Sequence, residues 1–196
     1  MKINLELIDS FGPSQGMRDN FTEKHPGWEG SPLELLELDD VPAGDIQWLL
    51  LRTDFITEEE LHLYAIFCAE QELPFFERGR PGDKRPHKAI EAKKRWLKDQ
   101  IGDEALKIAR IAAIEAYNSA CYTYATARLA DIALNAYSAA TAACAAFNAS
   151  SPYDAATAAY DTTHAAYNTR NAQLDELKRI FKDKGSGSAN RVEKDI

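Results

Sequence analysis

The sequence predicts an all-α fold: an alanine-rich bundle of long antiparallel helices with a small N-terminal appendage of extended chain and short helices. Alanine supplies 25 of the 68 residues from 105 to 172, a stretch with one proline and no glycine. Alanine is the strongest helix former because it loses no side-chain entropy on folding. Helix-start signals also recur along the chain, and alanine seams let helix axes approach closely.

Composition favours one domain plus an appendage. The chain has 196 residues, of which 45% are hydrophobic, enough for a core without disulfides or a structural metal. We expect an acidic N-terminal appendage over residues 1–54, an alanine-rich helical domain over 55–184 and a flexible tail over 185–196.

The first thirty residues predict little regular structure. Residues 2–8 alternate polar and apolar side chains, which is typical of a short half-buried strand or an extended arm. Residues 9–30 are rich in glycine and polar side chains and predict a loop, with Phe11, Phe21 and Trp28 as anchors.

Two short helices follow. Ser31 and Pro32 combine an N-cap residue with a proline in the first helical position, which predicts a helix through Leu38. Pro42 predicts a second helix through about Leu51, with its apolar side chains facing inward.

The next two helices have clearer signals. Thr57 and Glu60 have the spacing of a capping box, which predicts the start of a central helix. Pro74 should end or kink that helix. Asp83 and Pro86 predict the start of another, basic helix that extends to about Gln100.

The remaining chain predicts long helices. A single helix over residues 103–148 would measure about 69 Å, so we expect an interruption near residues 118–122. Pro152 restarts the pattern, and an apolar residue then recurs every seventh position. This seam over residues 152–183 predicts a packing face or a homo-oligomer interface. Gly185 should end the helix.

Charge is unevenly distributed along the chain. The formal net charge is −8, and residues 1–80 hold 17 acidic and 6 basic side chains, whereas residues 81–100 are basic. An acidic half disfavours direct binding to nucleic acid, whose phosphates attract Lys and Arg. It favours a protein partner with a basic surface, although it also serves solubility.

Cysteine usage and hydropathy predict a cytoplasmic protein. Cys68, Cys121 and Cys144 stand singly in apolar helical surroundings and are interpreted as reduced core thiols. The sequence has no apolar run of about 18 residues, so no membrane association is expected.

Catalytic and metal-binding motifs are absent from the sequence, including phosphate-binding glycine loops and paired-cysteine sites. His62 near Glu58 and Glu59, His87 near Glu91, and His164 near Asp161 each supply at most half of a metal site. We therefore predict no catalytic residue, metal or cofactor, and a protein that is not an enzyme.

Two polar groupings remain. Carboxylates near one arginine in the turn before the basic helix predict an ion-pair cluster that locks the turn. Tyrosines and arginines on the later helices could instead line a pocket for a small nucleotide signal. The cluster comprises Glu70, Glu77, Asp83, Arg85 and Glu91; the pocket comprises Tyr117, Tyr124, Arg128, Tyr160, Tyr167 and Arg170.

Residues 67–96 resemble a family described as putative immunity proteins, all-helical domains of bacterial polymorphic-toxin systems that also occur in phages. The resemblance extends over about residues 55–170 and implies an immunity or anti-defence role without catalytic residues. The matching elements are Cys68-Ala69-Glu70, Leu73-Pro74, Phe76-Glu77, Pro81-Gly82-Asp83, Arg85-Pro86, Ala89-Ile90-Glu91-Ala92 and Trp96.

The leading functional hypothesis is a non-enzymatic binding protein that neutralises a toxin or defence effector by covering its functional surface. The alternative is a sponge that sequesters a nucleotide-derived immune signal in the Tyr/Arg-lined pocket. The predicted partner contacts are the acidic residues Glu34, Glu37, Asp39, Asp40, Asp45, Glu58 and Glu59.

Overall fold

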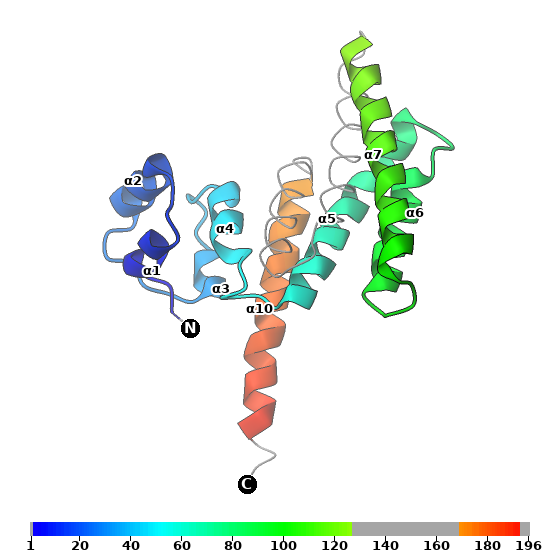
Figure 1. Cartoon of the computed structure of the whole chain (residues 1–196). Helices are drawn as coiled ribbons and strands as arrows, with labels where there is room; N and C mark the ends of the chain where they lie inside the picture. Colours follow the sequence, from blue (N-terminus) through cyan, green and yellow to red (C-terminus); the bar gives the residue numbers. More distant parts are fainter. Residues whose placement is uncertain (1, 127–168, 193–196) are drawn as a thin grey trace. The chain divides into compact units, whose positions relative to one another are not determined.

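The computed structural model describes residues 2–126 and 169–192, which form eight α-helices and no strand. The predicted all-α fold is confirmed (Figure 1). The chain divides into two compact units: Met1–Leu50 with Asn171–Ile196, and Leu51–Arg170. We call these unit 1 and unit 2. Within the described residues, no helix is both long and apolar enough to span a membrane.

The N-terminal part of unit 1 is more helical than the sequence predicted. Helix α1 (Leu5–Ser10) begins where the Asn4 side chain accepts a hydrogen bond from the Leu7 amide at 2.9 Å. The predicted strand over residues 2–8 is therefore wrong, apart from one antiparallel bridge between Ile3 and Gly30.

Helix α2 (Gln15–Lys24) occupies a segment for which a loop was predicted. It begins at Ser14, whose hydroxyl caps the Met17 amide at 3.2 Å. Its Phe21 is buried and packs edge-to-face on Trp28, with ring centroids 5.6 Å apart, as expected of two anchor residues. Burial of this ring offsets the poor helix propensity of the segment.

Three further helices belong to unit 1. Helix α3 (Pro32–Leu35) has the predicted Ser31 cap, which forms a full capping box with Glu34. Helix α4 (Ala43–Leu50) buries its predicted inward face. In helix α10 (Arg170–Val192), Gln173 accepts a hydrogen bond from the buried Gln47 side chain at 2.8 Å.

Helix α10 does not end at Gly185, as predicted, but continues to Val192. Leu177 and Phe181, the last members of the predicted seam, are buried on it. The earlier part of the seam, and the predicted restart at Pro152, lie outside the described residues.

Unit 2 contains α5 (Glu58–Gly79), α6 (Arg85–Trp96) and α7 (Asp103–Thr126). The capping box of Thr57 and Glu60 is confirmed. Helix α5 continues through Pro74, so of the two expected outcomes, an end or a kink, the end is wrong. Proline removes one helical hydrogen bond, but the residues on either side include the fully buried Cys68 and Phe76.

Alanines form the contact between α6 and α7, as expected from the composition. Ala89 of α6 and Ala113 of α7 are both buried and pack in one cluster with Leu106 and Ala109. Helix α7 runs without interruption through residues 118–122, so the predicted break there is wrong. No glycine or proline occurs at that position to cause one.

Candidate functional site

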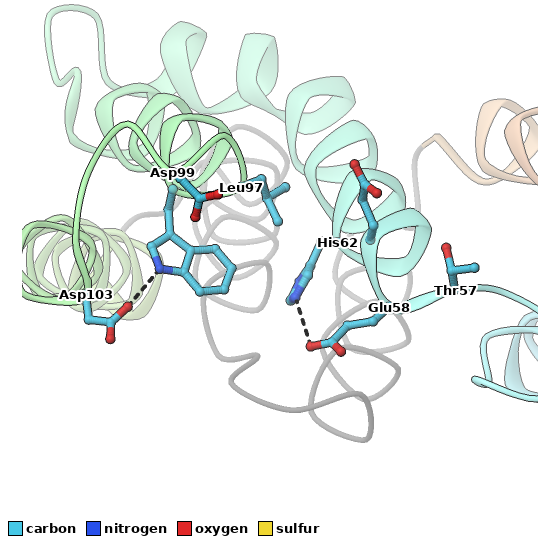
Figure 2. Close-up of a pocket in the computed structure, with 8 residues that line it drawn as sticks. Thr57, Glu58, His62, Leu97, Asp99 and Asp103 are labelled. Carbon is cyan, nitrogen blue, oxygen red and sulfur yellow. Dashed lines mark hydrogen bonds and ion pairs between the residues drawn. The ribbon is translucent and has the colours of Figure 1, made fainter.

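Unit 2 contains a pocket of about 660 Å³ between the start of α5 and the connection from α6 to α7 (Figure 2). Four carboxylates, one histidine and one tryptophan contribute to it. The lining residues are Thr57, Glu58, Glu59, His62, Trp96, Leu97, Asp99 and Asp103.

The start of α5 supplies one wall. The Thr57 cap fixes where the helix begins, so Glu58 and Glu59 lie in its first turn. The positive end of the helix dipole stabilises carboxylates at this place. His62 follows Glu58 by four residues and therefore lies on the same face of the helix.

The end of α6 supplies the opposite wall. Asp99 has a φ of 54°, and its amide donates to the Trp96 carbonyl at 2.9 Å. The Gln100 amide donates to the Arg95 carbonyl at 2.9 Å. These two bonds form a Schellman motif with Asp99 in the left-handed position that glycine usually occupies. The helix thus ends at Trp96 and not near Gln100, as predicted.

Polar and aromatic contacts fix the position of Trp96 in the pocket lining. Its indole N–H donates to Asp103 at the start of α7 at 2.9 Å. Its ring lies edge-on to His62, with centroids 5.8 Å apart. Lys93, which is fully buried, places Nζ 4.1 Å from the centroid of the same ring.

Burial lowers the pKa of two basic side chains, His62 in the pocket lining and Lys93 next to Trp96. Burial, with a smaller contribution from the Lys93 charge, lowers the pKa of His62 to about 4. Burial also lowers the pKa of Lys93 to about 8, against the attraction of Glu58. At neutral pH the imidazole of His62 is therefore neutral, and Lys93 is largely charged.

We expect Asp99→Gly to raise the free energy of unfolding by about 1 kcal/mol, because glycine adopts a positive φ without the steric cost that a side chain brings. Chemical denaturation of the purified protein measures the change. Asp99→Ala is the matched control and should bring no gain in stability, since it keeps the steric cost of a side chain. Equal effects of the two variants would contradict this explanation.

The predicted ion-pair cluster is divided among three basic residues in the structure. Glu70 and Glu91 contact Lys94, at 2.5 and 3.3 Å. Arg85 binds Asp83 through two hydrogen bonds and lies 3.8 Å from Glu115, and Glu77 binds Lys84 at 2.5 Å. Arg85 thus pairs with one of the four predicted carboxylates.

Most predicted partner-binding residues of unit 1 have local roles. Glu34 belongs to the capping box, and hydrogen bonds from Ser31 lower its pKa. Glu37 lies 3.2 Å from Lys178, and Asp40 lies 2.9 Å from the ring of His25. Burial raises the pKa of the half-buried Asp45. Asp39 is exposed, and Glu58 and Glu59 line the pocket in unit 2.

Part of the predicted Tyr/Arg pocket can be placed. Tyr117 and Tyr124 are on α7, and Arg170 is the first residue of α10. Arg128, Tyr160 and Tyr167 lie outside the described residues.

Trp96, Asp99 and Asp103 were not among the site residues predicted from the sequence. Trp96 and Asp103 flank a short polar connection between two helices, but nothing in the sequence places this connection beside the capping box of Thr57. Among the described residues, no group of three or more potential ligands could hold a metal ion.

The described residues thus form an all-α protein, and one pocket in unit 2 is rich in carboxylates. A family model described as "Imm-5 like putative immunity protein" matches residues 53–180, a region that contains the whole pocket and the motifs of residues 67–96. The chain belongs to this family. Comparison with curated proteins finds no match, and comparison with solved structures finds none.

Proposed function

We propose that this protein is a non-enzymatic inhibitor that binds a protein toxin or a defence effector with a basic surface and covers that partner's functional surface. Membership of the immunity family carries the proposal, because the matched region spans α5, α6 and α7. Inhibition by coverage needs a complementary surface and a slow dissociation rate, and no reactive group.

Charge supports a basic partner. The chain has a formal net charge of −8. In unit 2, four carboxylates line a pocket to which no lysine or arginine among the described residues contributes. Opposite potentials on two proteins accelerate their encounter and disfavour wrong partners.

Neutralisation of a purified effector tests the proposal. The effector is first isolated by affinity capture on this protein, from bacterial or phage-infected lysate, and its activity is then titrated with the protein. We expect inhibition to be complete at a molar ratio near one. Inhibition by a small fraction of an equivalent would indicate turnover and contradict the proposal, as would full effector activity at saturation. The lysate that yields the effector separates bacterial immunity from anti-defence.

We expect the double variant Asp39→Lys/Asp40→Lys to weaken the complex by about tenfold at low salt and to reduce its salt dependence, because exposed complementary charges act mainly on association. Surface plasmon resonance at several salt concentrations measures both effects. Glu6→Lys/Glu23→Lys, with the same charge change at exposed positions outside the predicted contact set, is the control. Equal weakening by both variants would exclude Asp39 and Asp40 as contacts.

A further inference from the structure

The polar groups at the pocket surface are almost all hydrogen-bond acceptors. The indole N–H of Trp96 is a donor, but it already donates a hydrogen bond to Asp103. Within the described chain, no lysine or arginine lies at ion-pair distance from Glu58, Glu59 or Asp99. Elsewhere in unit 2, by contrast, Glu70, Glu77 and Asp83 each have such a partner. Glu58, Glu59 and Asp99 are thus available to an external cation.

His62 adds an independent observation. Its side chain is buried to all but a few per cent and lines the pocket, where Figure 2 shows the ring directed toward Glu58. The distance from Nε2 to the Glu58 carboxylate is 3.8 Å, too long for a hydrogen bond. In the part of the chain that the structure describes, no hydrogen bond to this imidazole is present. Buried polar side chains normally have a partner.

Figure 2 shows how the groups are arranged. Glu58 and His62 lie on one side of the pocket, whereas Asp99 and Asp103 lie on the other. A ligand between them would meet carboxylates from two directions and a neutral imidazole nitrogen. Such a ligand must be positively charged and rich in hydrogen-bond donors, and it must have no acceptor that requires a donor from the protein.

We propose that this pocket receives the guanidinium group of an arginine from the partner protein, an inference that rests on the proposed inhibitor function. A guanidinium has five donors and no acceptor, is planar and weakly hydrated, and pairs with carboxylates through two parallel hydrogen bonds. The charge of Lys93 opposes binding, but Lys93 is not part of the pocket lining, and its ammonium is buried against the Trp96 ring.

Titration of the full-length protein with N-acetyl-arginine methylamide tests the proposal without the partner. The citrulline analogue, which has the same shape without the charge, is the matched ligand. The chain has three tryptophans, so the indole N–H signals in a nitrogen-15 NMR spectrum are few, and Trp96→Phe assigns the relevant one. We expect the Trp96 signal to shift and saturate with a dissociation constant on the order of 1 mM for arginine.

The citrulline analogue should leave the Trp96 signal in place. Equal shifts with both compounds, or no shift with arginine, would overturn the proposal. The isosteric variant Glu58→Gln/Asp99→Asn should weaken arginine binding by about tenfold, the effect of lost charge-assisted hydrogen bonds. Glu6→Gln/Glu23→Gln removes the same charge from unit 1 and should leave the affinity unchanged; equal weakening would show a non-specific field effect and overturn the site.

This experiment separates the two proposals. If the pocket does not bind arginine but the protein still neutralises its effector at a ratio near one, the arginine site is wrong and the inhibitor function stands. If arginine binds in the pocket but no effector is inhibited, the proposed function fails and the site remains. Circular dichroism of each variant establishes that its helices are retained.

Discussion

Replacement of Lys93 by methionine is expected to raise the free energy of unfolding at pH 7 by about 2 kcal/mol. The side chain is fully buried, and Nζ has no hydrogen-bond partner within the described chain. Burial lowers the pKa of Lys93 from 10.5 to about 8, which corresponds to about 3 kcal/mol of lost stability. The cation–π contact with the Trp96 ring offsets about 1 kcal/mol of this loss. Methionine has a similar length and no charge.

The effect should depend on pH with a definite sign. Below about pH 8, Lys93 is protonated in the folded and the unfolded state, so the full cost of burying the charge is present. Between pH 8 and 10.5 the unfolded state binds more protons, and stability therefore rises with pH. The advantage of Lys93→Met should accordingly shrink as pH approaches 10.5.

Denaturant unfolding at pH 7, 9 and 10.5 measures this dependence. Lys88→Met removes an exposed charge from the same helix and should change stability by less than about 0.5 kcal/mol at each pH. A Lys93→Met protein that is less stable than the parent at pH 7 would show that the buried ammonium stabilises the fold, the opposite of the expected effect.

Replacement of His62 by phenylalanine is expected to protect the protein against acid by up to about 3 kcal/mol. The pKa of His62 is lowered from 6.5 to about 4 by burial and by the Lys93 charge. Above pH 6.5 the imidazole is neutral in both states. As pH falls toward 4 the unfolded state takes up a proton first, so stability is lost. Phenylalanine keeps an aromatic ring against Trp96 and cannot be protonated.

Unfolding curves from pH 7 to pH 4 measure the difference between the parent and His62→Phe. His87→Phe is the control, because His87 is exposed and is not transferred from water on folding. In the Lys93→Met protein the pKa of His62 should move back toward 6.5, which NMR of the imidazole can follow. A His62→Phe protein with the acid sensitivity of the parent would refute the assignment.

The parts of the fold that were predicted correctly from the sequence depend on local chemistry. The Ser31 and Thr57 caps, for example, act on amides three residues away, so they can be recognised in the sequence. Close helix packing through alanines was likewise expected from the composition, whereas the particular pairing of Ala89 with Ala113 was not.

The wrong predictions arise where packing outweighs local preference. Helix α2 forms despite Gly16, and its Phe21 is buried against Trp28. Helix α5 continues past Pro74, between the buried Cys68 and Phe76. A sequence does not show which side chains will become buried, and burial of one ring can exceed the cost of one lost hydrogen bond.

The pocket was the least predictable feature. It joins the first turn of α5 to the connection that follows α6, and its shape depends on the left-handed backbone of Asp99. Aspartate is not the usual residue for that conformation, and nothing local indicates it. An acidic contact surface on this chain was a prediction from the sequence, whereas the combination of Glu58 and Glu59 with His62, Asp99 and Asp103 required the fold.

The buried amide pair in unit 1 has a consequence for the order in which the molecule assembles. Gln47 and Gln173 are 126 positions apart, so their contact closes a very long loop, at an entropic cost of about 4 kcal/mol. Helices α5, α6 and α7 meet through much shorter separations and can form earlier. Unit 1 is therefore expected to complete its packing after the contacts among α5, α6 and α7 have formed.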